Sequence, residues 1–466
     1  MSSDRRTLFT VAWTLCALSM LWVDSPEWIR DPASFTGAVA LAACAVVALS
    51  RPGAWYALPL LAAGALLFLV ARMPFMPNHF HFAALLNSGI LLACLRRDPE
   101  RGLAEIVPLG RWMLILLYFF AVLHKLNWDY FDPTVSSAWA IHLEIVEQRL
   151  PFLPAWPWLA EPVIWLSLAV EVAIPLLLVF SRTRGAGIWT ALLFHGFLAF
   201  TPIRYVLDFT VMTLALMTLF LSESEAERIR AAERARSKRI AGRFPRWSRR
   251  LGGAGAALAT AAAVLLLLLD HPRAELITVR AFHLYGFALC AWFTVAVAWP
   301  LLRTHPAPTP PPAGDFRLRP SPAALALALM LANGFAPYTG WKSQMSFSMF
   351  SNLRSDDGRT NHLFLPMLSK GPGDRARAVE ILEVNHPTLQ WVAARGDRVT
   401  WFEARRHLSE FEDAHMVWRE GGRTYTADRR TDPDHELFAP LAWWERKLVI
   451  YRTAVPPEDV PVPHRH

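Results

Sequence analysis

The sequence predicts an all-α, multi-pass membrane bundle of about ten or eleven spans, followed by a small C-terminal extramembrane domain that is α+β or mostly β. Three observations predict this fold class. Hydrophobic residues make up 54% of the 466-residue chain and charged residues only 18%, which is typical of a chain whose main solvent is lipid. Long apolar runs recur over most of the chain. After about Pro337 they give way to short segments with a β-type pattern, such as 378–384 and 447–451.

The apolar runs have lengths close to those of transmembrane helices. A hydrocarbon core about 30 Å thick takes about 20 mostly apolar residues per helix. Several apolar runs are slightly shorter than this length. If the fifth run is broken, the number of spans is ten rather than eleven. Arg5 and Arg6 precede the first run as in a signal peptide, but no small-residue cleavage site follows, so a retained first span is expected. The expected spans are 7–24, 34–50, 54–72, 79–95, 111–126, 162–181, 185–202, 205–221, 251–269, 282–302 and 321–337.

Basic residues are concentrated in alternate loops, as the positive-inside rule requires. The other set of loops has only scattered basic residues, and its first loop also holds Asp24, Glu27 and Asp31. We therefore expect a multi-pass protein of the cell membrane with a cytoplasmic N-terminus and, for an odd number of spans, an extracytoplasmic C-terminal domain. The basic loops lie within residues 5–6, 51, 96–111, 182–184, 228–250 and 303–319.

Four regions follow from these patterns. Residues 1–221 form the main transmembrane domain, and residues 222–250 form a basic cytoplasmic segment whose composition suits contact with anionic lipid. Residues 251–337 add further spans, which are interrupted by a proline-rich linker at 304–316 that cannot build a core. Residues 338–466 form the extracytoplasmic domain.

The charge and the cysteine content argue against two further classes of protein. The formal net charge is +8, but the basic residues are dispersed over loops, which indicates membrane topology rather than nucleic-acid binding. The cysteines all lie in apolar runs, and none has the spacing of a metal site. We therefore expect neither a metal site nor a disulfide framework. The cysteines are Cys16, Cys44, Cys94 and Cys290.

Ionisable residues inside the apolar runs are the first candidates for function, because in a bilayer such groups must be paired, hydrated or functional. Lys125 lies near the outward end of the fifth span. It is either a functional amine or a lysine that reaches the interface beside Trp128 and Tyr130. His79 lies at the outward end of the fourth span, with Asn87 near the same helix face. A hydrogen-bonded interior histidine is the alternative to a catalytic one.

Glu171 and His195 form a second group of polar residues inside the apolar runs. Glu171 lies about 14 Å along the sixth span at 1.5 Å per residue, so it cannot face lipid. His195 in the seventh span is its expected partner, because a buried acid and a histidine can share a proton. The pair is interpreted either as an interhelical clamp or as a proton relay. Arg204 and Asp208 are four residues apart, and an intrahelical ion pair explains them.

Three strings, in the expected order, resemble motifs of the vitamin K-dependent γ-carboxylase and HTTM (horizontally transferred transmembrane) families. YFFAVLHKLNWDYF (118–131) is similar to their aromatic, Ala-Gly, Lys-Leu pattern, with Val122 in the place of the usual glycine. PNHFHFAALL (77–86) resembles their Asn-His element, and EVAIPLLLVFSRTR followed by ALLFHGFLAF (171–200) resembles the next signature. The resemblance spans most of the first transmembrane domain. Residues 337–364 also look like a segment that follows the last span in bacterial HTTM proteins.

The resemblance implies that Lys125 is the base that deprotonates vitamin K hydroquinone, a menaquinol-type quinol. Oxygen chemistry on the quinol would then generate a stronger base, which removes a γ-proton from a substrate glutamate so that carbon dioxide can add. His79 would lie near the substrate carboxylate or the developing charge. An amine needs desolvation to act as a base at neutral pH, and an apolar site supplies it. The implied enzyme is a carboxylase-type lyase with membrane lipid and an extracytoplasmic peptide as partners.

Other functions stay open. No region resembles the propeptide-binding part of the animal carboxylases, so the fold could also keep a quinol pocket for a different reaction. One alternative is a non-catalytic, DoxX-like membrane protein that binds lipid or quinone or organises a complex. In that case Lys125 is an interfacial anchor that arginine would replace. Another is a proton-coupled transporter that uses Glu171 and His195, although no inverted repeat is visible.

Overall fold

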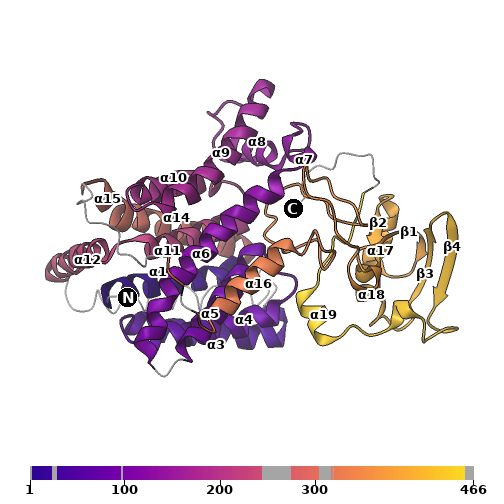
Figure 1. Ribbon diagram of the computed structural model, residues 1–466, viewed down its shortest axis with the longest axis horizontal. Helices are drawn as coiled ribbons and strands as arrows, with labels where there is room; N and C mark the ends of the chain where they lie inside the picture. Colours follow the sequence, from indigo (N-terminus) through magenta and orange to yellow (C-terminus); the bar gives the residue numbers. More distant parts are fainter. Residues whose placement is uncertain are drawn as a thin grey trace.

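The computed structural model describes residues 3–23, 29–95, 98–243, 274–303, 316–318 and 320–456. It is mostly helical, with 64% of its residues in helices, and it has a small C-terminal sheet (Figure 1). In Figure 1 the helices form one bundle, and the sheet lies beyond one end of it. The expected combination of a helical bundle with a small C-terminal domain is confirmed, and that domain is α+β.

Five helical segments among the described residues are long and apolar enough to cross a membrane, which supports the expected membrane protein. A sixth candidate is bent, because Arg204–Phe220 and Glu223–Arg236 meet at 116°. The five segments are Asp4–Val23, Pro32–Ser50, Arg101–Lys125, Pro157–Val179 and Leu276–Leu301. They lie in α1 (Ser3–Val23), α3 (Pro32–Ser50), α6 (Pro99–Lys125), η1 with α9 (Pro157–Leu159 and Ala160–Val179), and α14, η3 and α15 (Ala274–Phe293, Thr294–Ala298 and Trp299–Arg303).

The expected count of about ten or eleven spans is not supported. Several apolar runs form helices that are too short to cross a bilayer unbent. They are α4 (Ala57–Arg72), α5 (Asn78–Cys94), α10 (Arg184–Leu198) and α16 (Ala324–Phe335), with 16, 17, 15 and 12 residues. At 1.5 Å per residue these helices extend about 18 to 26 Å, which is less than the thickness of about 30 Å of a hydrocarbon core. The expected span 251–269 and most of the linker 304–316 lie outside the described residues.

Helix α6 runs through the middle of the bundle and contacts α5, α9, α11 (Arg204–Met217) and α16 (Figure 1). Helix α11 packs on α1 and α14 and continues through η2 (Thr218–Phe220), after which the chain turns into the basic helix α12 (Glu223–Arg243). Helices α3 and α4 approach so closely that a Cβ at Gly37 would lie 2.7 Å from the Cα of Phe68. Only glycine permits this contact.

Helix α6 ends at Lys125 because Asn127 redirects the chain. The Asn127 side chain accepts a hydrogen bond from the backbone N–H of Tyr130 (2.9 Å) and caps the short helix α7 (Trp128–Phe131). The chain then forms α8 (Ser137–Gln148) and returns through α9. This turn leaves Lys125 in the last turn of α6, beside α9.

The C-terminal domain is a four-stranded antiparallel sheet in the order β2-β1-β3-β4. The expected strand at 378–384 is confirmed as β1, in which Val379, Ile381 and Val384 are buried. The expected strand at 447–451 is wrong. A carboxylate oxygen of Glu445 accepts a hydrogen bond from the backbone N–H of Ala442 (2.8 Å) and starts a helical turn that ends within this segment. The elements are β1 (Ala378–Val384), α17 (Pro387–Ala394), β2 (Arg398–Thr400), α18 (Trp401–Leu408), β3 (His415–Glu420), β4 (Arg423–Asp428) and α19 (Trp443–Leu448), with the 3-10 turns η4 (Pro372–Asp374) and η5 (Glu436–Phe438).

Candidate functional site

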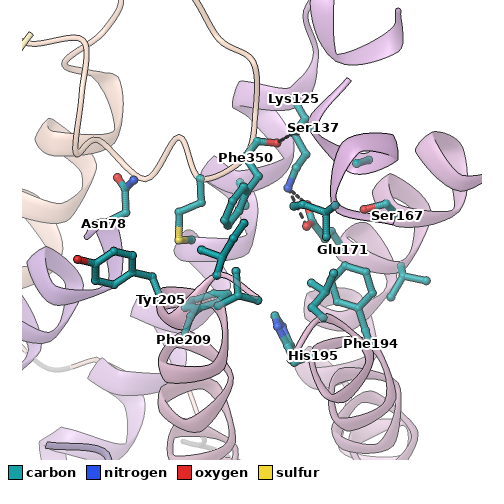
Figure 2. A pocket seen from close by; sticks show the side chains of 18 of the residues that line it. Asn78, Lys125, Ser137, Ser167, Glu171, Phe194, His195, Tyr205, Phe209 and Phe350 are labelled. Atoms are coloured by element: carbon teal, nitrogen blue, oxygen red, sulfur yellow. Dashed lines mark hydrogen bonds and ion pairs between the residues drawn. The ribbon is translucent and has the colours of Figure 1, made fainter. Parts of the chain in front are cut away.

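A cavity of about 1070 Å³ lies among α6, α9, α10 and α11, with α8 and residues 344–350 at its edge. This volume is close to the upper end of the range of about 300–1,000 Å³ that is common for small-molecule pockets. Most of the wall is apolar, with aromatic rings such as Phe194 and Phe209 (Figure 2). The cavity also brings together the candidate residues of the sequence, which are His79, Lys125, Glu171 and His195.

Lys125 and Glu171 form a buried ion pair in the cavity wall. The Lys125 amine lies 2.7 and 2.5 Å from the two carboxylate oxygens of Glu171 (Figure 2). The two side chains are only 5% and 11% exposed. The amine also lies 5.9 Å from the centre of the Tyr130 ring. Lys125 therefore points into the bundle and does not extend to an outer surface.

The Lys125–Glu171 pair brings two opposite charges into an apolar wall without adding net charge. Buried pairs of this kind stabilise a fold little in total, but removal of one partner leaves an uncompensated charge and costs about 3–5 kcal/mol. The pair is therefore stable as a unit. Any ligand in the cavity meets an ammonium group whose opposite charge is already supplied by the protein.

His79 on α5 forms a second pair, with Asp208 on α11. The Nε2 of His79 lies 2.9 Å from an Asp208 carboxylate oxygen, and both side chains are almost fully buried. The other Asp208 oxygen accepts a hydrogen bond from the hydroxyl of Ser19 on α1. The expected Arg204–Asp208 pair is thus replaced by contacts from Asp208 to two other helices. Asn87, expected near His79, instead accepts a hydrogen bond from the indole N–H of Trp13 (3.0 Å).

His195 on α10 contacts Tyr118 on α6 rather than Glu171. Its Nε2 lies 2.7 Å from the Tyr118 hydroxyl, and both residues are buried. The expected pairing of Glu171 with His195 therefore differs from the observed one, because the Lys125 amine occupies both oxygens of Glu171. His195 still lines the same cavity and lies below Lys125 in the view of Figure 2.

Residues 344–350 cover one side of the cavity. Met345, Met349 and Phe350 line it, and Phe350 lies beside Lys125 in Figure 2. The Phe347 backbone N–H donates to the side-chain oxygen of Asn78 at the start of α5 (2.7 Å). The Ser137 hydroxyl at the start of α8 donates to the Phe350 carbonyl. The segment between the last apolar helix and the sheet domain is therefore part of the cavity wall.

The arrangement can bind a mostly apolar molecule and exchange protons with it. Three proton-carrying pairs, Lys125–Glu171, His79–Asp208 and Tyr118–His195, lie at a wall that is mostly apolar. Among the described residues, no group of three or more His, Cys, Asp or Glu side chains could hold a metal ion. The apolar wall suits the ring and tail of an amphiphile, and the polar pairs suit its hydroxyl groups.

The partners of the predicted site residues were not predicted from the sequence. Tyr118 looks like one more aromatic residue of an apolar helix, and Ser19 like a small polar residue in the first span. Asp208 was noticed, but Arg204 four residues earlier offered a simpler explanation. The useful signal was its depth, since a carboxylate inside an apolar run needs a partner from another helix.

The fold and the cavity define a class of protein. It is a helical bundle with candidate membrane spans, a small α+β domain and a ligand-sized cavity that contains buried ionisable groups. Comparison with family models, with curated proteins and with solved structures found no match for this chain.

Proposed function

We propose that this chain is an integral membrane protein of the HTTM and vitamin K-dependent γ-carboxylase type, which binds a lipid-soluble quinol in the cavity and carries out base chemistry on it. The observation that carries this proposal is that Lys125 and His79, predicted independently from two separate motifs, line one largely apolar cavity. The motif resemblance adds the expectation of a carboxylase-type lyase with a peptide substrate on the extracytoplasmic side.

The residues present fit a quinol. Its ring and tail would contact the apolar wall around Val170, Phe194 and Phe209, and its hydroxyls would meet Lys125 and His79. Once bound, the quinol would supply the oxygen-dependent chemistry from which a strong base for a substrate glutamate arises. The chain itself supplies the shelter from water, the orientation and the proton acceptors.

Lys125 has two possible tasks in this proposal. As an ammonium paired with Glu171, it attracts a ligand oxygen that has lost its proton. It acts as a base, the role that the resemblance implies, only after its proton has passed to Glu171. Apolar surroundings favour such a transfer because a neutral pair avoids the desolvation cost of two charges.

The test compares quinol turnover in variants that keep the fold. Lys125→Ala leaves Glu171 as an unpaired buried charge, so it confounds activity with stability. The double variant Lys125→Met with Glu171→Met removes both charges and keeps similar side-chain volumes. We expect it to retain the thermal midpoint of the parent while losing menaquinol turnover in nanodiscs. Lys370→Met is the control, because this lysine is 44% exposed and does not line the cavity. Turnover retained in the double variant would remove the pair from the mechanism.

A non-catalytic, quinone- or lipid-binding protein is the second candidate, and the closed Lys125–Glu171 pair favours it, because both carboxylate oxygens already contact the amine. Extraction of copurifying lipids followed by mass spectrometry identifies the ligand under either proposal. Menaquinol turnover by the parent separates the two candidates. Lys125→Arg then tests whether the lysine is the base, because arginine preserves the ion pair but cannot serve as a base; binding without turnover in this variant would assign the base to Lys125.

A further inference from the structure

The two nitrogens of His79 have different environments. Nε2 faces Asp208 at 2.9 Å, and the ring itself lines the cavity. Asp208 is fully buried; one of its oxygens accepts a hydrogen bond from the Ser19 hydroxyl, and the other lies 2.9 Å from Nε2 of His79. Two polar partners of this kind stabilise an ionised carboxylate when both donate to it. An ionised Asp208 requires the proton of a neutral His79 to be on Nε2, which leaves the lone pair of Nδ1 for a ligand in the cavity.

The charge balance distinguishes this dyad from the Lys125–Glu171 pair. With a neutral imidazole, the His79–Asp208 dyad carries one negative charge in apolar surroundings, and uptake of a proton at His79 makes it neutral overall. The Lys125–Glu171 pair is already neutral, and its ammonium has no free lone pair. When His79 takes up a proton, the negative charge of the buried His79–Asp208 dyad is neutralised. The Lys125 ammonium can accept a proton only after it has lost one of its own.

Two other histidines line the cavity, His142 and His195, and both are less suited to this task. The Nε2 of His142 lies 2.9 Å from the Pro154 carbonyl, so no carboxylate positions this ring through Nε2. His195 also differs from His79 in its partner. Its Nε2 contacts the Tyr118 hydroxyl, and no contact of His195 with a carboxylate is found in the described part of the chain. A tyrosine hydroxyl is a weaker partner than a carboxylate for an imidazolium, because the bond is not assisted by an opposite charge.

We infer that His79, positioned by Asp208, accepts the proton of a hydroxyl ligand in the cavity, while Lys125 stays an ammonium that attracts the remaining oxygen. The O–H bond of the ligand breaks, an N–H bond forms at Nδ1, and the electron pair stays on the oxygen. This inference rests on the proposed function, and it exchanges the two roles that the motif resemblance implies for Lys125 and His79.

Asp208 acts here as a positioning residue. In Asp208→Asn the side chain keeps its size, but its amide can donate to Nε2, which moves the imidazole proton to Nδ1. His79 then presents a donor to the cavity in place of an acceptor. The same substitution also removes the charge that stabilises an imidazolium. Ligand ionisation should therefore fall in Asp208→Asn even though His79 is intact.

The experiment uses the full chain in lipid nanodiscs and a naphthol probe whose ionised form absorbs at longer wavelength than its neutral form. Tryptophan quenching measures binding, and absorbance measures the ionised fraction of bound probe. We expect the parent to bind and ionise the probe. His79→Gln should bind the probe without ionising it, because the proton acceptor is gone. Asp208→Asn should bind the probe but ionise it about tenfold less, which is the effect of losing one charge-assisted hydrogen bond. If His79→Gln does not fold, Asp208→Asn decides.

His81→Gln is the matched control. His81 is a buried histidine on the same helix, its Nδ1 faces the Pro77 carbonyl, and it does not line the cavity. Ionisation that persists in His79→Gln and Asp208→Asn but disappears in Lys125→Met with Glu171→Met would overturn the inference and assign the base to the lysine pair. A parent that binds the probe without ionising it would also overturn it. A parent that binds neither naphthol nor quinol would instead contradict the proposed function.

Discussion

Lys342 is a buried amine just before residues 344–350, the segment that covers one side of the cavity. It is 6% exposed, and its amine donates a hydrogen bond to the Met345 carbonyl (3.1 Å). Desolvation lowers the pKa of Lys342 from 10.5 to about 7. The group therefore opposes folding of this segment whenever it is protonated, because a buried ammonium with a carbonyl partner is poorly compensated.

The stability of the chain should depend on pH through Lys342. Between pH 7 and 10.5 the unfolded amine binds more protons than the folded one, so stability rises with pH across this window and is lost as the pH falls toward 7. Lys342→Met should raise the thermal midpoint at pH 7 and reduce its increase between pH 7 and 9. Tryptophan fluorescence measures both midpoints. An identical pH dependence in the parent and in Lys342→Met would contradict the assignment, and Lys370→Met serves as the exposed control.

At this scale the sequence identified the important side chains but not their partners. Lys125, His79, Glu171 and His195 were predicted because ionisable groups in apolar runs require an explanation, and all four line the cavity. Their pairing depends on which helix faces cross, and that is set by contacts between residues far apart in the chain. Spacing along one helix could not reveal it.

Asn127 joins the end of α6 to residues 351–363, the segment that directly follows the residues covering the cavity. Its amide donates to the carbonyls of His124 (2.7 Å) and Ser351 (2.5 Å), and its oxygen accepts from Tyr130 and from the Asn361 amide. Nearby, the Leu363 backbone N–H donates to the Leu126 carbonyl (2.8 Å). The position of the segment therefore depends on polar contacts as well as on the apolar contacts of residues such as Leu353.

Asn127→Ala should loosen this segment. Each buried polar group left without a partner costs about 1–3 kcal/mol, so hydrogen exchange should accelerate in residues 350–363 while the sheet domain keeps its protection. Exchange measured by mass spectrometry on the full chain resolves the two regions. Asn385→Ala, at an exposed asparagine beside β1, is the matched control and should leave residues 350–363 unchanged. Unchanged exchange in both variants would show that apolar packing holds the segment.

A helix or strand is predictable from the sequence where the length of a segment and its pattern of apolar residues indicate the same type of structure. β1 has alternating buried residues at its start and coincides with the predicted strand. The apolar runs 54–72 and 79–95 were expected to be full spans, but the helices that form there have only 16 and 17 residues. An apolar composition indicates that a segment is buried away from water. It does not indicate whether the segment is buried in lipid or against other helices of the same bundle.

At the scale of the whole molecule, the sheet domain is attached to the bundle beside the cavity. The Lys447 amine donates to the carbonyls of Ala71 and Met73 (both 3.0 Å), where α4 ends. The Arg406 guanidinium lies 5.3 Å from the centre of the Phe75 ring, and Phe75 also lines the cavity. The domain and the basic helix α12 lie at opposite ends of the molecule in Figure 1.

This arrangement makes the proposed orientation testable. Lysine and arginine favour the cytoplasmic side, so α12 should be cytoplasmic and the sheet domain extracytoplasmic. Ala232→Cys places a thiol on an exposed face of α12, and Thr424→Cys places one on the exposed strand β4. A membrane-impermeant maleimide applied to intact cells should label the second variant, and the first only after permeabilisation. The parent chain reports the background from its own cysteines. Labelling of Ala232→Cys alone in intact cells would reverse the orientation, and labelling of both sites would mean that the bundle does not separate them across a membrane.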